Sequence, residues 1–173
     1  PRSCMKSIAE GLFNSTLRYG ICLFLRPCPN ITDPASNALT QIQTIQNDMV
    51  RSVAGVFRRD KVNMANLRDS LGFLSVNQLL CQTIITEAQK IINYNTVPTI
   101  KNTLIDTGSS SIVTRSRTVS AVRQPLVRCR KTEGFSTYAA KLLNALPEKI
   151  RKMDTSKPAF KTELQRWIKT YIN

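Results

Sequence analysis

The sequence predicts a mainly α protein: a helical bundle, then an extended basic segment and a C-terminal helical portion. Apolar residues recur three and four positions apart over several long segments, which is the periodicity of a helix face. Prolines and glycines fall between these segments. A hydrophobic fraction of 42% in 173 residues is enough for a folded core. We expect the bundle at residues 1–105, a basic extended segment or linker at 106–134 and the C-terminal helical segment at 135–173.

The N-terminal part should contain two long helices. Over residues 3–23, side chains such as Met5, Ile8 and Leu12 keep helical spacing, and the proline-rich stretch RPCPNITDP then interrupts the chain. A second helical pattern starts at residue 37. It ends at Gly55, a residue type that favours the left-handed conformation found at helix ends.

The stretch NMANLRDSLGFLSVNQLL predicts a short helix that stops at Gly72 and a new helix that begins with a capping box. In that box, Ser75 and Gln78 satisfy each other's backbone N–H groups. The helix that follows, to about Ile92, is the most apolar one and should pack on several neighbours. A further short helix is expected after Pro98.

The C-terminal part should contain a helix over FSTYAAKLLNALPEKI, broken at Leu146 and Pro147, and a terminal helix. In SKPAFKTELQRWIKTYIN, Ser156 is the expected N-cap and Trp167 the centre of a buried apolar stripe. The basic side chains of this helix lie largely away from the stripe. They form either a solvated charged face or a surface for an anion; they are Lys161, Arg166 and Lys169.

The charge balance indicates an anionic partner. Lys and Arg number 25 against 11 Asp and Glu, giving a net charge of +14, far more than solubility requires. The excess is greater in the second part, because residues 1–105 hold 11 basic and 6 acidic side chains and residues 106–173 hold 14 and 5. RNA or DNA is the expected partner, although charge by itself defines no mechanism.

The stretch SIVTRSRTVSAVRQPLVRCRK, residues 111–131, contains no acidic residue and almost no helical periodicity. It is either an extended segment that contacts phosphates or a disordered linker. In an extended segment, residues two apart share a face about 6.5 to 7 Å from each other, close to the spacing of successive phosphates. The candidate contacts are Arg115, Arg117, Arg123, Arg128, Arg130 and Lys131.

A second basic cluster follows the helix that starts at residue 37. Cations at this end of a helix suit its dipole, and they could equally reach a phosphate. The cluster consists of Arg51, Arg58, Arg59 and Lys61.

The residue types exclude several chemistries. The chain has no histidine, and its five cysteines form no CxxC pair, so neither a zinc site nor a histidine-based catalytic group is expected. No glycine-rich phosphate cradle occurs, so we expect no cofactor. The longest apolar run, ICLFL, is too short to cross a bilayer. Because the cysteine pattern fits reduced thiols, we expect an intracellular protein of the nucleus or cytoplasm. Because the chain opens on PRSC, we expect part of a longer protein.

Several segments in the same order resemble the region after the palm of reverse transcriptases from non-LTR (LINE-type) retrotransposons. LFNSTLRYGICLF resembles the first thumb helix of that family, and LTQIQTIQNDMVRSVAGVFR the next one. LGFLSVNQLL is similar to the turn before a long helix, and GFSTYAAKLLNALPEKIR with PAFKTELQRWIKTYI to the terminal signature. The matched positions are Tyr19, Gly20, Gln46, Asn47, Arg51 and Gly55. One departure is Leu143, where the family usually has Trp.

The resemblance implies a thumb that grips the template and primer duplex behind an active site located elsewhere. The paired aspartates and metal ions of polymerisation belong to the palm, and this sequence contains no Asp-Asp pair. The implied partners are RNA or DNA and the upstream finger and palm domains of the same polymerase, with no membrane. Two other classes stay open. One is an independent or domesticated basic helical nucleic-acid-binding protein, and the other is a helical structural or oligomerising module.

Overall fold

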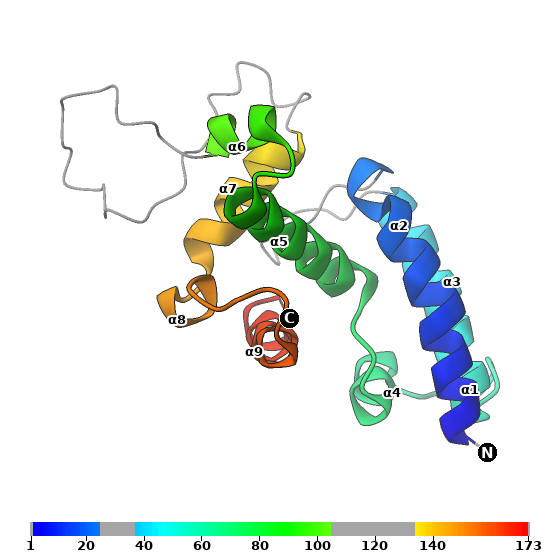
Figure 1. The fold of residues 1–173 in the computed structure, drawn as a ribbon. Coiled ribbons are helices and arrows are strands. Elements are labelled where there is room, and N and C mark those ends of the chain that lie inside the picture. Colours follow the sequence, from blue (N-terminus) through cyan, green and yellow to red (C-terminus); the bar gives the residue numbers. More distant parts are fainter. Residues whose placement is uncertain (1, 25–36, 105–133, 173) are drawn as a thin grey trace. The chain divides into compact units, whose positions relative to one another are not determined.

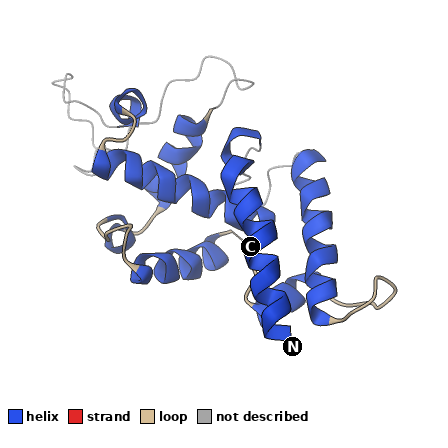
Figure 2. Ribbon diagram, turned by 45° about the vertical axis from the view of Figure 1, so that its right-hand side comes forward, coloured by secondary structure: helices blue, strands red, loops and turns tan. Residues whose placement is uncertain are grey.

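The computed structural model describes residues 2–24, 37–104 and 134–172, and helices make up the regular secondary structure of these ranges (Figure 1, Figure 2). The predicted mainly α class is confirmed. The predicted extended basic segment lies almost entirely outside the described residues. The chain divides into two compact units, one of Pro1–Cys81 with Ile168–Asn173 and one of Gln82–Trp167. Helices α5 and α9 therefore contribute residues to both units.

The first unit begins with one continuous helical run made of α1 (Arg2–Ala9), η1 (Glu10–Asn14) and α2 (Ser15–Phe24). The predicted helix is present, but its middle is a π-helical turn, which the spacing did not predict. The hydroxyl of Ser15 donates to the carbonyls of Gly11 and Leu12, and that of Thr16 donates to Leu12 at 2.7 Å. Such hydroxyls take up carbonyls where the regular helical ladder is disturbed.

The buried face of this helical run differs from its apolar stripe. Met5, Ile8 and Leu12 are 49%, 54% and 69% exposed. Ala9 instead packs into a core with Val50, Val53 and Phe73. Helical spacing located the helix but did not identify the side that faces the core.

Helix α3 (Asn37–Ala54) lies beside α1 and is followed by a loop and by α4 (Met64–Leu71) (Figure 1). Both predicted glycine stops are confirmed. Gly55 and Gly72 have φ of 71° and 76°, in the left-handed region that side chains disfavour. After α4, the Phe73 N–H donates to the Arg68 carbonyl at 2.9 Å, as in a helix-ending turn of this kind.

Helix α5 (Val76–Tyr94) begins with the predicted capping box. The Ser75 N–H donates to Gln78 Oε1 at 3.0 Å, and the Gln78 N–H donates to Ser75 Oγ at 3.2 Å. The same glutamine also donates from Nε2 to the Ile172 carbonyl at 2.9 Å. One side chain thus caps α5 and holds the end of the C-terminal helix within the first unit.

The second unit contains the rest of α5 with α6 (Pro98–Leu104), α7 (Phe135–Ala145), α8 (Glu148–Arg151) and most of α9 (Pro158–Tyr171). The predicted break at Leu146 and Pro147 separates α7 from α8. The guanidinium of Arg151 donates to the carbonyls of Leu143 and Leu146 at 2.7 and 3.2 Å, which satisfies acceptors at the end of α7.

The terminal helix is present, with two differences from the expectation. Phe160 and Leu164 are fully buried, whereas Trp167 is only half-buried. The helix starts at Pro158, two residues after Ser156, so Ser156 does not occupy the N-cap position. Its backbone N–H instead donates to Asp154 Oδ1 at 3.0 Å.

Candidate nucleic-acid interface

A polar network fixes α3 against the corner between α4 and α5. Gln46 is fully buried and donates to the Leu74 carbonyl at 2.9 Å. Gln43 accepts the Val76 N–H at 2.9 Å and donates to Gln46 Oε1 at 2.8 Å. These bonds hold the middle of α3 to the polypeptide that precedes α5, and the loop of residues 55–63 leaves the C-terminal end of the same helix.

Arg68 completes the network from α4. Its guanidinium donates to Asn47 Oδ1 at 2.8 Å, and Asn47 also accepts from Gln43 at 3.0 Å. Burial lowers the pKa of Arg68 from its usual value, against a smaller opposing influence of Asp69. Sequence reasoning missed Arg68, because its partner lies 21 positions away.

The second predicted basic cluster lies at the end of α3 and in the loop that follows, and Arg51 of α3 holds this loop together. The Arg51 guanidinium donates to the carbonyls of Phe57 and Asp60 at 2.8 and 3.3 Å. The Asp60 carboxylate accepts the Phe57 N–H at 2.9 Å. Arg51 therefore positions the loop, with one terminal nitrogen bonded to two backbone carbonyls.

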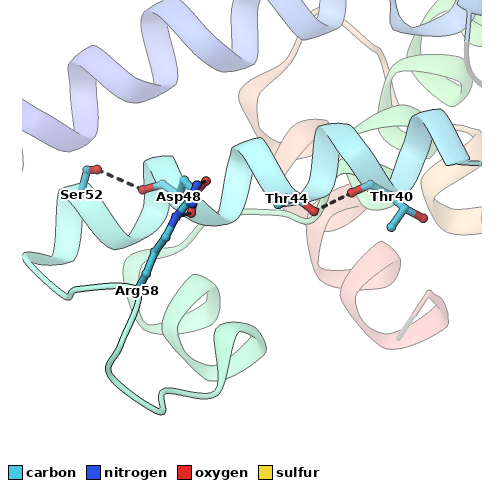
Figure 3. A network of polar contacts seen from close by, with 5 residues as sticks. All are labelled: Thr40, Thr44, Asp48, Ser52 and Arg58. Atoms are coloured by element: carbon cyan, nitrogen blue, oxygen red, sulfur yellow. Dashed lines mark hydrogen bonds and ion pairs between the residues drawn. The ribbon is translucent and has the colours of Figure 1, made fainter.

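Arg58 reaches back from the loop to Asp48 on α3 (Figure 3). The pair is bidentate, with Nε donating to Oδ1 at 2.9 Å and a terminal nitrogen to Oδ2. The hydrogen bond from Arg58 holds the pKa of Asp48 below its usual range, and the same bond raises the pKa of Arg58. The charge of Arg58 is thus largely offset, although its side chain is 79% exposed.

Arg59 and Lys61 are the exposed cations that this loop presents to solvent. The Arg59 guanidinium lies 5.1 Å from the centroid of the Phe57 ring, within cation–π range. The predicted cluster therefore separates into a positioning arginine, a paired arginine, an exposed arginine over an aromatic ring and an exposed lysine. This arrangement suits an anionic ligand that also has a flat apolar part.

The predicted cations of α9 likewise lie in different environments, one exposed and two in ion pairs. Lys161 is exposed, Arg166 pairs with Glu163 at 2.7 Å, and Lys169 pairs with Asp69 of α4 at 2.8 Å. Exposed ion pairs of this kind contribute only about 0 to 1 kcal/mol, so a phosphate can compete for either cation.

The most basic stretch of the chain lies outside the described residues, and its phosphate contacts stay a prediction. This concerns Arg115, Arg117, Arg123, Arg128, Arg130 and Lys131.

Within the ranges that the structure describes, no group of three or more His, Cys, Asp and Glu side chains could hold a metal ion. None of the helices described there is long and apolar enough to span a membrane. Comparison with protein-family models, with curated proteins and with solved structures finds no match.

Proposed function

We propose that this chain is the non-catalytic thumb and post-thumb part of a non-LTR retrotransposon RNA-directed DNA polymerase, and that it grips template–primer nucleic acid through phosphate contacts. The observation that carries the proposal is the loop after α3. Arg51 and Asp60 fix its backbone, and it presents Arg59 and Lys61 to solvent. A fixed loop with exposed cations can bind phosphates without the entropic cost of ordering itself.

The residues that carry the resemblance stabilise the fold of the first unit, which supports a local fold shared with the thumb of that polymerase family. Gln46 and Asn47 belong to the network that fixes α3, Arg51 holds the loop, and Gly55 ends the helix. Leu143, which departs from the family pattern, is 1% exposed, so this position is apolar and buried with the smaller side chain.

The exposed apolar side chains of the N-terminal helical run support contact with preceding polymerase domains. Met5, Ile8 and Leu12 recur at helical spacing and are each about half exposed or more. Apolar side chains gathered on one exposed face commonly mark a protein contact. Under this proposal, the partners of this exposed face are the upstream finger and palm domains of the same polymerase.

An independent nucleic-acid-binding protein is the second candidate, because the first unit has its own core. The upstream coding sequence distinguishes the polymerase from the independent protein. An upstream palm with paired aspartates supports the polymerase, whereas an unrelated domain supports the independent protein.

A salt titration tests nucleic-acid binding itself. The full chain would be titrated with an RNA–DNA duplex and with a second duplex of scrambled sequence. Because each neutralised phosphate adds about 0.7 to 0.9 to the slope of log affinity against log salt, we expect a slope equivalent to several phosphates and equal affinity for both duplexes. A flat slope would show that the cations are merely solvated.

A further inference from the structure

Phe57 is 66% exposed in a loop whose backbone is held in place. Its N–H donates to the Asp60 carboxylate at 2.9 Å, and its carbonyl accepts from Arg51 at 2.8 Å. Both polar groups of its peptide backbone are therefore engaged, while the ring extends into solvent.

A single exposed apolar side chain needs no functional explanation. Phe57 differs from an ordinary exposed apolar residue because cations lie next to it in the sequence and in space. Arg58 and Arg59 follow it directly, and the Arg59 guanidinium lies over the ring at 5.1 Å from the centroid. An aromatic face beside exposed cations is the combination that binds bases by stacking and their phosphates by charge.

We propose that Phe57, with Arg59 and Lys61, is a stacking site for an unpaired base of a bound nucleic acid. The inference rests on the proposed function and specifies its ligand as nucleic acid with a single-stranded end or junction. Inside a continuous duplex both faces of each base are already stacked on its neighbours, so the ligand proposed for the Phe57 ring is an unpaired base. Because the Arg59 guanidinium already lies over one face of the ring, the base would stack on the opposite face, and the exposed Lys61 would contact a phosphate next to that base.

The fixed backbone gives this site an energetic advantage. Arg51 and Asp60 order the loop before any ligand arrives, so binding a base need not order the loop. An apolar protein segment could also cover an exposed Phe. The exposed cations Arg59 and Lys61, with the Arg59 guanidinium over the ring, favour an anion with a planar apolar part.

The test uses the full chain and three probes with the same number of phosphates. One is a blunt RNA–DNA duplex, one is a shorter duplex with a single-stranded overhang, and one carries the same overhang without bases. Three proteins are compared: the parent, F57L, which keeps an apolar side chain but loses the aromatic face, and F57W, which keeps that face. Circular dichroism confirms that each variant is folded.

We expect the parent and F57W to prefer the overhang with bases, and the emission of F57W to be quenched by that probe. F57L should lose about 5- to 150-fold in affinity for the overhang with bases, which corresponds to one stacked base. Its affinity for the blunt and base-free probes should stay unchanged.

If F57L keeps the preference, or if the parent has none, the stacking site is overturned, while steep salt dependence on the blunt duplex would still uphold the proposed function. Absence of binding to all three probes would overturn both.

Discussion

The buried side-chain amide of Gln46 donates a hydrogen bond to the backbone carbonyl of Leu74 at 2.9 Å, across 28 positions of sequence. Leu74 lies just before the capping box of α5, so this single bond connects the middle of α3 to the start of the next long helix. A buried carbonyl that loses its donor has no water to replace it.

Replacing Gln46 by Leu should therefore destabilise the chain by about 1 to 3 kcal/mol, because the Leu74 carbonyl is left unsatisfied. Urea unfolding of the variant measures this loss. Gln41→Leu is the matched control, since Gln41 is an exposed glutamine of the same helix and its replacement should change the free energy of unfolding little. Equal stability of the two variants would contradict the structural role of Gln46.

In the C-terminal helix, we expect Phe160→Ala to cost more stability than Trp167→Ala, although Trp is the larger residue. Phe160 is fully buried and Trp167 only half-buried. Truncating a buried Phe costs about 3 to 5 kcal/mol. Thermal melts rank the two variants, with the exposed Lys161→Ala as the control on the same helix. The reverse order would place Trp167 at the centre of the packing after all.

Asp48→Asn should increase the affinity for nucleic acid. The substitution removes the carboxylate that pairs with Arg58, which frees a third cation next to Arg59. The expected gain is about fivefold at most, because solvent-exposed ion pairs contribute little.

Glu87→Gln is the control for Asp48→Asn. It removes one negative charge from a similar exposed pair, with Lys90. Fluorescence anisotropy with one duplex at one salt concentration compares the two variants. A gain as large for Glu87→Gln would mean that only the net charge matters.

Asp154 should make stability depend on pH. The backbone N–H of Ser156 lowers the pKa of this carboxyl from its usual 3.8, with a lesser contribution from the Tyr94 hydroxyl. Since the pKa is lowered in the folded chain, the stabilisation is fully present above the unfolded value and is lost as pH falls through the folded value. Asp154→Asn should thus melt below the parent at pH 7.

The difference in melting temperature between the parent and Asp154→Asn should then close as pH falls below about 4. Tyr94→Phe, which removes the lesser donor at 3.1 Å, should show a smaller difference that closes over the same range. A difference that stays constant from pH 7 to pH 3 would exclude this carboxylate as the source.

The basic stretch at residues 111–131 should contribute specific phosphate contacts. Replacing four of its arginines by Gln should weaken binding much more than replacing four lysines of the second unit, because long-range attraction would penalise both sets alike. The arginines are Arg115, Arg117, Arg128 and Arg130; the lysines are Lys101, Lys149, Lys152 and Lys157. Duplex affinity at one salt concentration measures both, with circular dichroism to confirm folding. Equal losses would reduce the stretch to a charged linker.

The position of most helices, and the ends of α3, α4 and α5 named above, could be predicted because their signals are local. Gly55 and Gly72 adopt the left-handed conformation at helix ends, and Ser75 and Gln78 satisfy each other within three positions. A capping bond or a glycine stop depends on residues within about one turn of helix, so the sequence itself contains all the partners.

Only the tertiary structure determined which partner each basic side chain contacts. The sequence grouped Arg51, Arg58 and Arg59 as equivalent cations, and the folded loop gives them three different environments. Lys169 finds its acid 100 positions away, in Asp69. Charge and periodicity determine which residues are basic and which segments are helical. The partner of each basic side chain depends on elements brought together from distant parts of the chain, and one-dimensional spacing does not contain that information.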